Sequence, residues 1–182
     1  MMDKSRLFQA VLDSGATKAA FLPQAQIVLS AHFRDICASN QCGGYGRCWA
    51  CPPYIGDIDV LMDRVRAFPN ALLYQSIAEI EDSFDIEGMF EAGRAHALLS
   101  QRIQQAVQPL FQSEFLHLTC GGCHLCETCA KPEDQPCRHP GKPLLSLEGC
   151  GVDVYNTTKN TELKYINGQN TVTYFGMILF TE

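Results

Sequence analysis

Hydrophobic positions recur along the chain with a helical period in three places. Apolar residues three and four positions apart predict a helix near the N-terminus that ends at Gly15. Asp57 is a suitable cap for a second helix over residues 58–68, and Asp85 opens the longest one, which ends around Phe111. The predicted core-facing residues are Leu7, Phe8, Val11 and Leu12, then Ile58, Leu61, Val65 and Phe68, then Ile86, Phe90, Ile103, Val107 and Leu110.

Short apolar runs without that period predict strands. The predicted strands cover residues 26–30, 71–78, 115–119 and 172–180, of which the last, VTYFGMILF, is the clearest. A further helix is predicted over residues 144–159, although two glycines interrupt it. Four strands with covering helices predict a compact α/β fold, and we expect one domain over residues 1–182.

Composition narrows the classes of function. Hydrophobic residues make up 46% of the chain, as in an ordinary globular core, while the net charge is −6 and no three Lys or Arg residues are consecutive. The charge argues against a nucleic-acid-binding protein. The N-terminus leads into an amphipathic stretch, so we expect no signal peptide and no membrane segment. These features predict a cytoplasmic protein, in which thiols stay reduced.

Ten cysteines are present, and nine of them fall in two segments that we call the first loop (residues 37–54) and the second loop (residues 120–140). The first loop holds Cys37, Cys42, Cys48 and Cys51, and the second holds Cys120, Cys123, Cys126, Cys129 and Cys137. Disulfide frameworks spread cysteines along a chain, whereas close spacing suits metal ligation. We expect both loops to leave strand ends and to share one side of the sheet.

The second loop has the spacing of an iron–sulfur site. Three two-residue gaps separate its first four cysteines, and Cys137 follows between prolines in PCRHP. Each short gap bends the backbone around one corner of a cluster and directs amides at the sulfurs. Zinc knuckles instead pair two C-x2-C units across a longer stretch, so the spacing favours iron and sulfide over zinc. His124 and His139 are expected beside the site and not as ligands.

The first loop leaves two chemistries open. Four thiolates from its four cysteines would close a tetrahedral zinc site. Three thiolates would instead hold a [4Fe–4S] cluster with one open iron, where a substrate could bind. The chain carries no G-x-G-x-x-G, P-loop or H-E-x-x-H sequence, so nucleotide binding has no support from motifs.

Both loops resemble signatures of a known family. The patterns are C-x4-C-G-x-Y-G-x2-W-x-C-P-P from Cys37 and C-x2-C-x2-C-x7-C-R-H-P from Cys123. They resemble those of a prokaryotic family of unknown function that is labelled predicted metal-binding protein, over roughly residues 25–180. The resemblance implies metal binding without a reaction. It assigns Cys123, Cys126, Cys129 and Cys137 to one site and Cys37, Cys42 and Cys51 to another, while Cys48, Cys120 and Cys150 are not motif positions.

The expected function is that of an iron–sulfur protein. It would hold one [4Fe–4S] cluster in the second loop, with a second cluster or zinc in the first, and transfer electrons to a redox partner protein. One alternative is a zinc-binding structural or docking module. The other is an enzyme that uses an open iron held by Cys37, Cys42 and Cys51.

Overall fold

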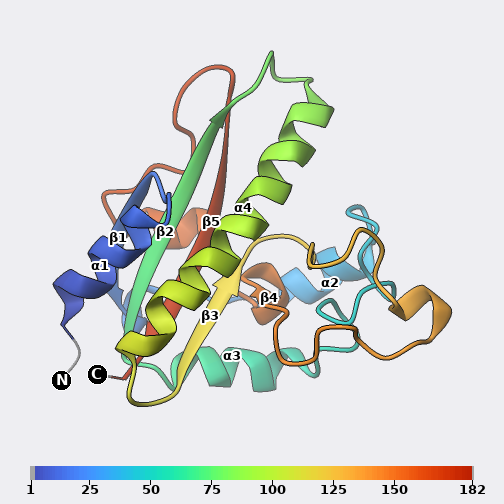
Figure 1. Cartoon of the computed structure of the whole chain (residues 1–182), viewed down its shortest axis with the longest axis horizontal. Helices are drawn as coiled ribbons and strands as arrows, with labels where there is room; N and C mark the ends of the chain where they lie inside the picture. The colour runs from blue at the N-terminus through green and yellow to red at the C-terminus, as the bar shows by residue number, and fades with distance from the viewer. Residues whose placement is uncertain (1–2, 182) are drawn as a thin grey trace.

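A five-stranded mixed sheet forms the centre of the computed structural model, which describes residues 3–181 (Figure 1). Its order is β1-β2-β5-β3-β4, and only β3 and β4 are parallel. The strands are β1 (Lys18–Pro23), β2 (Asn70–Glu79), β3 (Phe115–Thr119), β4 (Leu145–Ser146) and β5 (Thr171–Phe180). β2 and β5 pair along their whole length and form the middle of the sheet.

Helices lie on both faces of this sheet. They are α1 (Lys4–Asp13), α2 (His32–Ala38), α3 (Ile58–Arg66), α4 (Ile86–Val107) and α5 (Val154–Thr158). Short 3-10 turns cover Gln24–Gln26, Gln108–Leu110, Lys131–Glu133 and Glu148–Cys150. The long helices begin at aspartate caps: the Asp57 carboxylate accepts from the amide of Asp59, and the Asp85 carboxylate accepts from that of Gly88. These caps satisfy amides that the first helical turn leaves unpaired.

Alternation along β2 and β5 divides the core into two layers. Leu72 and Tyr74 face α1 and α4, whereas Leu73 and Met177 face α3 and the turns that precede α5. Successive strand residues point to opposite faces, and both faces are covered, so these four side chains are all fully buried. The apolar run of β5 therefore reflects burial on both sides.

Most predicted elements are confirmed, including the α/β class, but the strand count is five and not four. The predicted strand over residues 26–30 is wrong: Gln24–Gln26 is a turn, and Leu29 makes only an isolated bridge to Val152. Two strands are missing from the prediction: β1, which lies just upstream, and the two-residue β4. The helix predicted over residues 144–159 is also wrong, because Gly151, at φ +80°, ends one turn before α5 begins.

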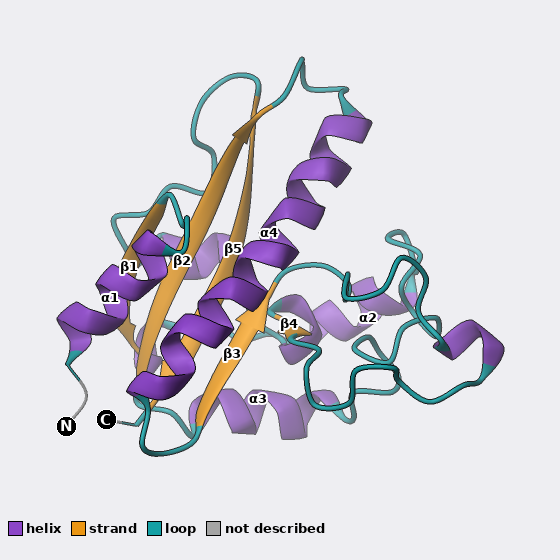
Figure 2. Cartoon of the chain, in the orientation of Figure 1, coloured by secondary structure: helices purple, strands orange, loops and turns teal. Residues whose placement is uncertain are grey.

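Both cysteine loops lie together beyond the carboxyl end of β3, in the part of the molecule that Figure 2 colours almost entirely as loop. The second loop leaves β3, as expected. The first loop does not leave a strand, since α2 carries Cys37 and delivers the chain to it. Among residues 3–181, no helix is long and apolar enough to cross a membrane.

Candidate metal centre

The two loops pack against each other, although more than sixty positions separate them in the sequence. Cys48, Ala50 and Cys51 of the first loop form a small buried cluster, and Cys123 and Cys129 of the second loop pack against it. Thiols that the sequence divides into two groups therefore meet at one interface.

A hydrogen bond and two cation–π contacts also join the two loops. The indole Nε1 of Trp49 donates a hydrogen bond to the Gln135 carbonyl oxygen at 2.9 Å. The Nζ atom of Lys131 lies 4.7 Å from the centre of the Trp49 ring and 4.6 Å from that of Tyr54, and it also contacts the Asp134 carboxylate. A lysine between two rings is attracted to both, so the charge ties the second loop to the first.

Glycine at position 44 lets two sulfurs approach the backbone. A Cβ atom there would lie 3.2 Å from Cys51 Sγ and 3.7 Å from Cys42 Sγ. Gly43, directly before it, and Gly46, two positions after it, have φ angles of +73° and +69°, which other residues rarely adopt. The CGGYG segment thus folds tightly beside the thiols of Cys42 and Cys51.

Cys48 is the thiol that joins the two groups. It lies within hydrogen-bonding reach of Cys123 and Cys51, and these contacts lower its pKa. The same contacts, followed by burial, raise the pKa of Cys51 and of Cys123. The three sulfurs are therefore neighbours, and a metal that binds deprotonated cysteine could use thiols from both loops.

The remaining first-loop thiols lie close to this trio. Burial and then the neighbouring Cys42 raise the pKa of Cys37. Cys42 and Cys37 also contribute to the raised pKa of Cys51, after its contact with Cys48 and its burial. Cys42 thus lies near enough to Cys37 and Cys51 to raise the pKa of both, while Cys48 contacts the second loop.

Two of the cavities beside the second loop are each lined by several of its cysteines. The narrower one has a free volume of about 20 Å³ and is lined by Cys48, Cys123, Cys126, Cys129 and Cys137. The wider one, which we call the α4 cavity, has a free volume of about 460 Å³ and is bordered by six thiols: Cys42, Cys48, Cys120, Cys123, Cys126 and Cys129. Four cysteines therefore border both cavities.

Burial raises the pKa of Cys120 and Cys150, two cysteines outside the family signatures. Cys120 directly follows β3, and burial raises its pKa well above the ordinary value. Cys150 belongs to the apolar core on the α3 face of the sheet, where burial raises its pKa to about 12. Cys150 thus sits among aliphatic side chains, apart from both loops.

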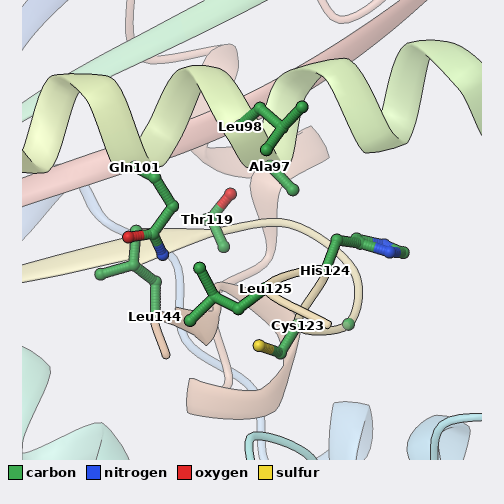
Figure 3. A pocket seen from close by; sticks show the side chains of 9 residues that line it. Ala97, Leu98, Gln101, Thr119, Cys123, His124, Leu125 and Leu144 are labelled. Atoms are coloured by element: carbon green, nitrogen blue, oxygen red, sulfur yellow. The ribbon is translucent and has the colours of Figure 1, made fainter. Parts of the chain in front are cut away.

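Polar groups around the second loop mainly contact the backbone. The amide of His139 donates to Cys137 Sγ at 3.4 Å, and Arg138 donates to the Thr128 carbonyl oxygen at 2.8 Å. Figure 3 shows a small pocket between α4 and this loop, in which the His124 side chain points away from the other labelled residues. Burial and then the charge of Arg94 lower the pKa of His124.

The donor set suits a metal that prefers sulfur. Thiolates are the ligands that iron–sulfur clusters and zinc use, and eight thiols border the two cavities or lie against those that do. Within residues 3–181, no three His, Cys, Asp or Glu side chains are already arranged around a point that could hold a metal ion. The thiols fit such a group chemically, and binding it would draw them together.

Some residues near the centre carry no sequence signal. Arg47 and Arg94 come from different elements and both border the α4 cavity. Lys131 joins the loops through ring contacts that no spacing rule encodes. A cysteine pattern reveals candidate ligands, whereas these partners depend on how distant segments fold together.

Comparison with known proteins adds one positive finding. A sequence model of the family described as "Predicted metal-binding protein (DUF2284)" matches residues 20–180. No curated protein and no solved structure matches the chain.

Proposed function

The chain belongs to this family of predicted metal-binding proteins, and on that premise we propose that it is a [4Fe–4S] protein that transfers electrons to a redox partner protein. Cys123, Cys126, Cys129 and Cys137 would hold the cluster. The observation that carries the proposal is that all four border one narrow cavity, in a loop with iron–sulfur spacing.

A cluster bound there would supply one-electron transfer. The residues around it would tune its environment. Trp49, Leu125 and Pro143 also border the narrow cavity and would exclude water from it. The His139 amide, which already donates to Cys137 Sγ, would stabilise negative charge on that thiolate. Both effects change the reduction potential of a cluster.

In the first loop, Cys37, Cys42 and Cys51 would hold a second cluster or zinc. Cys42 and Cys51 lie close together at Gly44, and Cys37 is near enough to contribute to the raised pKa of Cys51, which supports a shared site. Three thiolates on a cluster would leave one iron open, and that is the form in which the protein would be an enzyme. We further propose that residues 1–182 act as one domain in the cytoplasm, where the thiols stay reduced.

One observation favours a second candidate, a zinc-binding structural or docking module. Cys48 contacts both Cys51 and Cys123, and a single zinc ion needs sulfurs that are this close together. Such a site would join the two loops and would carry out no redox chemistry.

Metal analysis of anaerobically purified protein tests both candidates. We expect iron and sulfide in equal amounts and a broad absorption near about 400 nm that bleaches on reduction. Zinc without iron or sulfide would refute the electron-transfer proposal and support the structural module.

Three variants assign the ligands. Cys126→Ala should remove about half or more of the iron, because loop order and metal binding are coupled. Cys150→Ala, in the apolar core, is the matched control and should keep its iron. If the clusters use the family cysteines, Cys48→Ser should leave the metal in place. If a zinc ion is instead shared between the loops, Cys48→Ser should lose it and Cys126→Ala should retain it.

A further inference from the structure

The α4 cavity has the size of a small-molecule site. Its free volume is about 460 Å³, within the usual range for ligand pockets. α4 borders it on one side and the two cysteine loops on the other, and Tyr174 of β5 also contributes. A molecule in this cavity would lie directly against the thiols of the candidate metal centre.

Two arginines border the cavity without a partner of their own. Among residues 3–181, the guanidinium groups of Arg47 and Arg94 make no ion pair and donate no hydrogen bond. By contrast, the guanidinium of Arg64 lies 3.1 Å from the Glu114 carboxylate and that of Arg66 lies 2.7 Å from the Asp63 carboxylate. A guanidinium group binds carboxylate or phosphate oxygens through paired hydrogen bonds. Among the described residues that line the cavity, Glu127 is the one carboxylate beside these two arginines.

An aromatic surface lies next to these charges. Phe90 is 67% exposed on α4 and borders the cavity. The Tyr174 hydroxyl donates to the Met89 carbonyl oxygen at 2.6 Å, and Gly93 lies so close to the ring that a Cβ atom there would be 3.2 Å from it. Tyr174 is therefore fixed against α4, and an apolar group between it and Phe90 would cover exposed ring surface.

We propose that the α4 cavity binds a small organic anion, with its carboxylate or phosphate held by Arg47 and Arg94 and its apolar body against Phe90 and Tyr174. The inference deepens the proposed function and rests on it in one respect: the ligand would lie beside a metal only if the cysteines hold one. Binding of the anion itself requires only the arginines and the rings.

Phenyl phosphate tests the proposal, since it carries both an anionic head and a ring. Binding is measured by isothermal titration calorimetry at low salt on the protein as purified. Inorganic phosphate, which lacks the ring, and phenol, which lacks the anionic head, serve as comparison probes. We expect phenyl phosphate to bind more tightly than either. Arg94→Gln and Arg47→Gln should each weaken its binding about tenfold or more. Arg102→Gln, at an exposed position on the same helix outside the cavity, should not.

Phe90→Ala separates the two parts of the site. With the ring removed, phenyl phosphate should bind no more tightly than inorganic phosphate. Failure of phenyl phosphate to bind with a Kd below about 10 mM would overturn the proposal. Equal losses of affinity for phenyl phosphate in Arg94→Gln and Arg102→Gln would also overturn the proposal, because the overall charge of the protein would then explain the binding.

Metal content, measured on the same samples, keeps this result apart from the proposed function. Should Arg47→Gln and Arg94→Gln lose metal while anion binding to the remaining protein is unchanged, the arginines would serve to offset the charge of the centre, and the anion site would be refuted. Should the wild-type protein hold no metal yet bind phenyl phosphate through both arginines, the anion site would stand and the iron–sulfur proposal would fail.

Discussion

The sheet and the cysteine loops are held together by different interactions. In the sheet, β2 and β5 pair over ten residues, and both faces are covered by buried aliphatic side chains. In the loops, the backbone is fixed by turns, and the main contacts between them are Trp49 with Gln135, Lys131 with two rings, and cysteines with each other. Apolar burial is the main stabilising interaction of the first region, whereas the second depends on a small number of polar, cation–π and thiol contacts.

A buried polar network connects the two regions. The Tyr74 hydroxyl is hydrogen-bonded to Ser100 Oγ and to His117 Nε2, both at 2.8 Å, and Ser100 Oγ lies 2.8 Å from Thr119 Oγ1. Thr119 is the last residue of β3, directly before the second loop. The place where the second loop begins is therefore set by the sheet, although the rest of the loop is not.

The largest expected effect comes from removing apolar burial in the sheet. Leu73 is fully buried between β1 and β5, so Leu73→Ala should lower the free energy of unfolding by about 2–5 kcal/mol. Urea unfolding followed by far-ultraviolet circular dichroism measures this. Leu98→Ala, at a position 51% exposed on α4, is the control and should cost much less. Similar costs for the two variants would contradict the view that the sheet depends on its core.

Acid should destabilise the sheet and the helix that covers it through two buried histidines, His117 on β3 and His96 on α4. Burial lowers the pKa of His96 to about 4 and that of His117 to about 3. The folded pKa lies below the unfolded value of about 6.5, so the stability that these neutral groups contribute is complete above pH 6.5 and is lost as the pH falls below it. Between pH 6.5 and 5, each histidine should lower the free energy of unfolding by on the order of 2 kcal/mol.

His96→Asn tests this pH dependence. The amide should keep the contact that His96 Nδ1 makes with Ser76 Oγ at 2.7 Å, and it does not titrate. The variant should therefore lose less stability than the wild type between pH 6.5 and 5, as measured by urea unfolding. Metal loss in acid affects both proteins equally and cancels in the comparison. If the free energies of unfolding of the variant and the wild type changed in parallel with pH, His96 would contribute nothing to the pH dependence of stability.

Sequence reasoning succeeds where the signal is local. Asp57 and the apolar positions that follow it identify α3, because a cap and a helical period are encoded within a few residues. It fails for β4, which has two residues and exists because it pairs with β3. It also misplaces the strand near residue 26, since the pairing of β1 with β2 and not local hydrophobicity determines which segment joins the sheet.

The same limit applies to the candidate site. The spacing of the cysteines indicates metal binding, and the family match supports it. The sequence does not reveal that Cys48 meets Cys123, because that contact depends on the packing of loops more than sixty residues apart. Arg47 and Arg94 are likewise brought to one cavity only by the fold.

The smallest expected effect concerns the contact between the loops. Lys131→Ala removes the charge that lies between the rings of Trp49 and Tyr54, which should weaken the docking of the two loops slightly. Trp49 is the only tryptophan of the chain, so its fluorescence reports on this interface alone. In Lys131→Ala, its emission should shift to longer wavelength and acrylamide should quench it more strongly, while the circular dichroism of the sheet stays the same.

Lys159→Ala is the matched control for that experiment. Lys159 Nζ lies 4.0 Å from the centre of the Tyr155 ring, which is a similar contact made away from the cysteines. The control should leave Trp49 fluorescence unchanged, because Tyr155 belongs to α5 on the other side of the sheet from α4. Urea unfolding can be followed by circular dichroism, which reports on the sheet, and by Trp49 fluorescence, which reports on the loops. If Lys131→Ala lowered both midpoints by the same amount, the loops and the sheet would unfold as one unit. The loops and the sheet would then not be independent, although different interactions stabilise them.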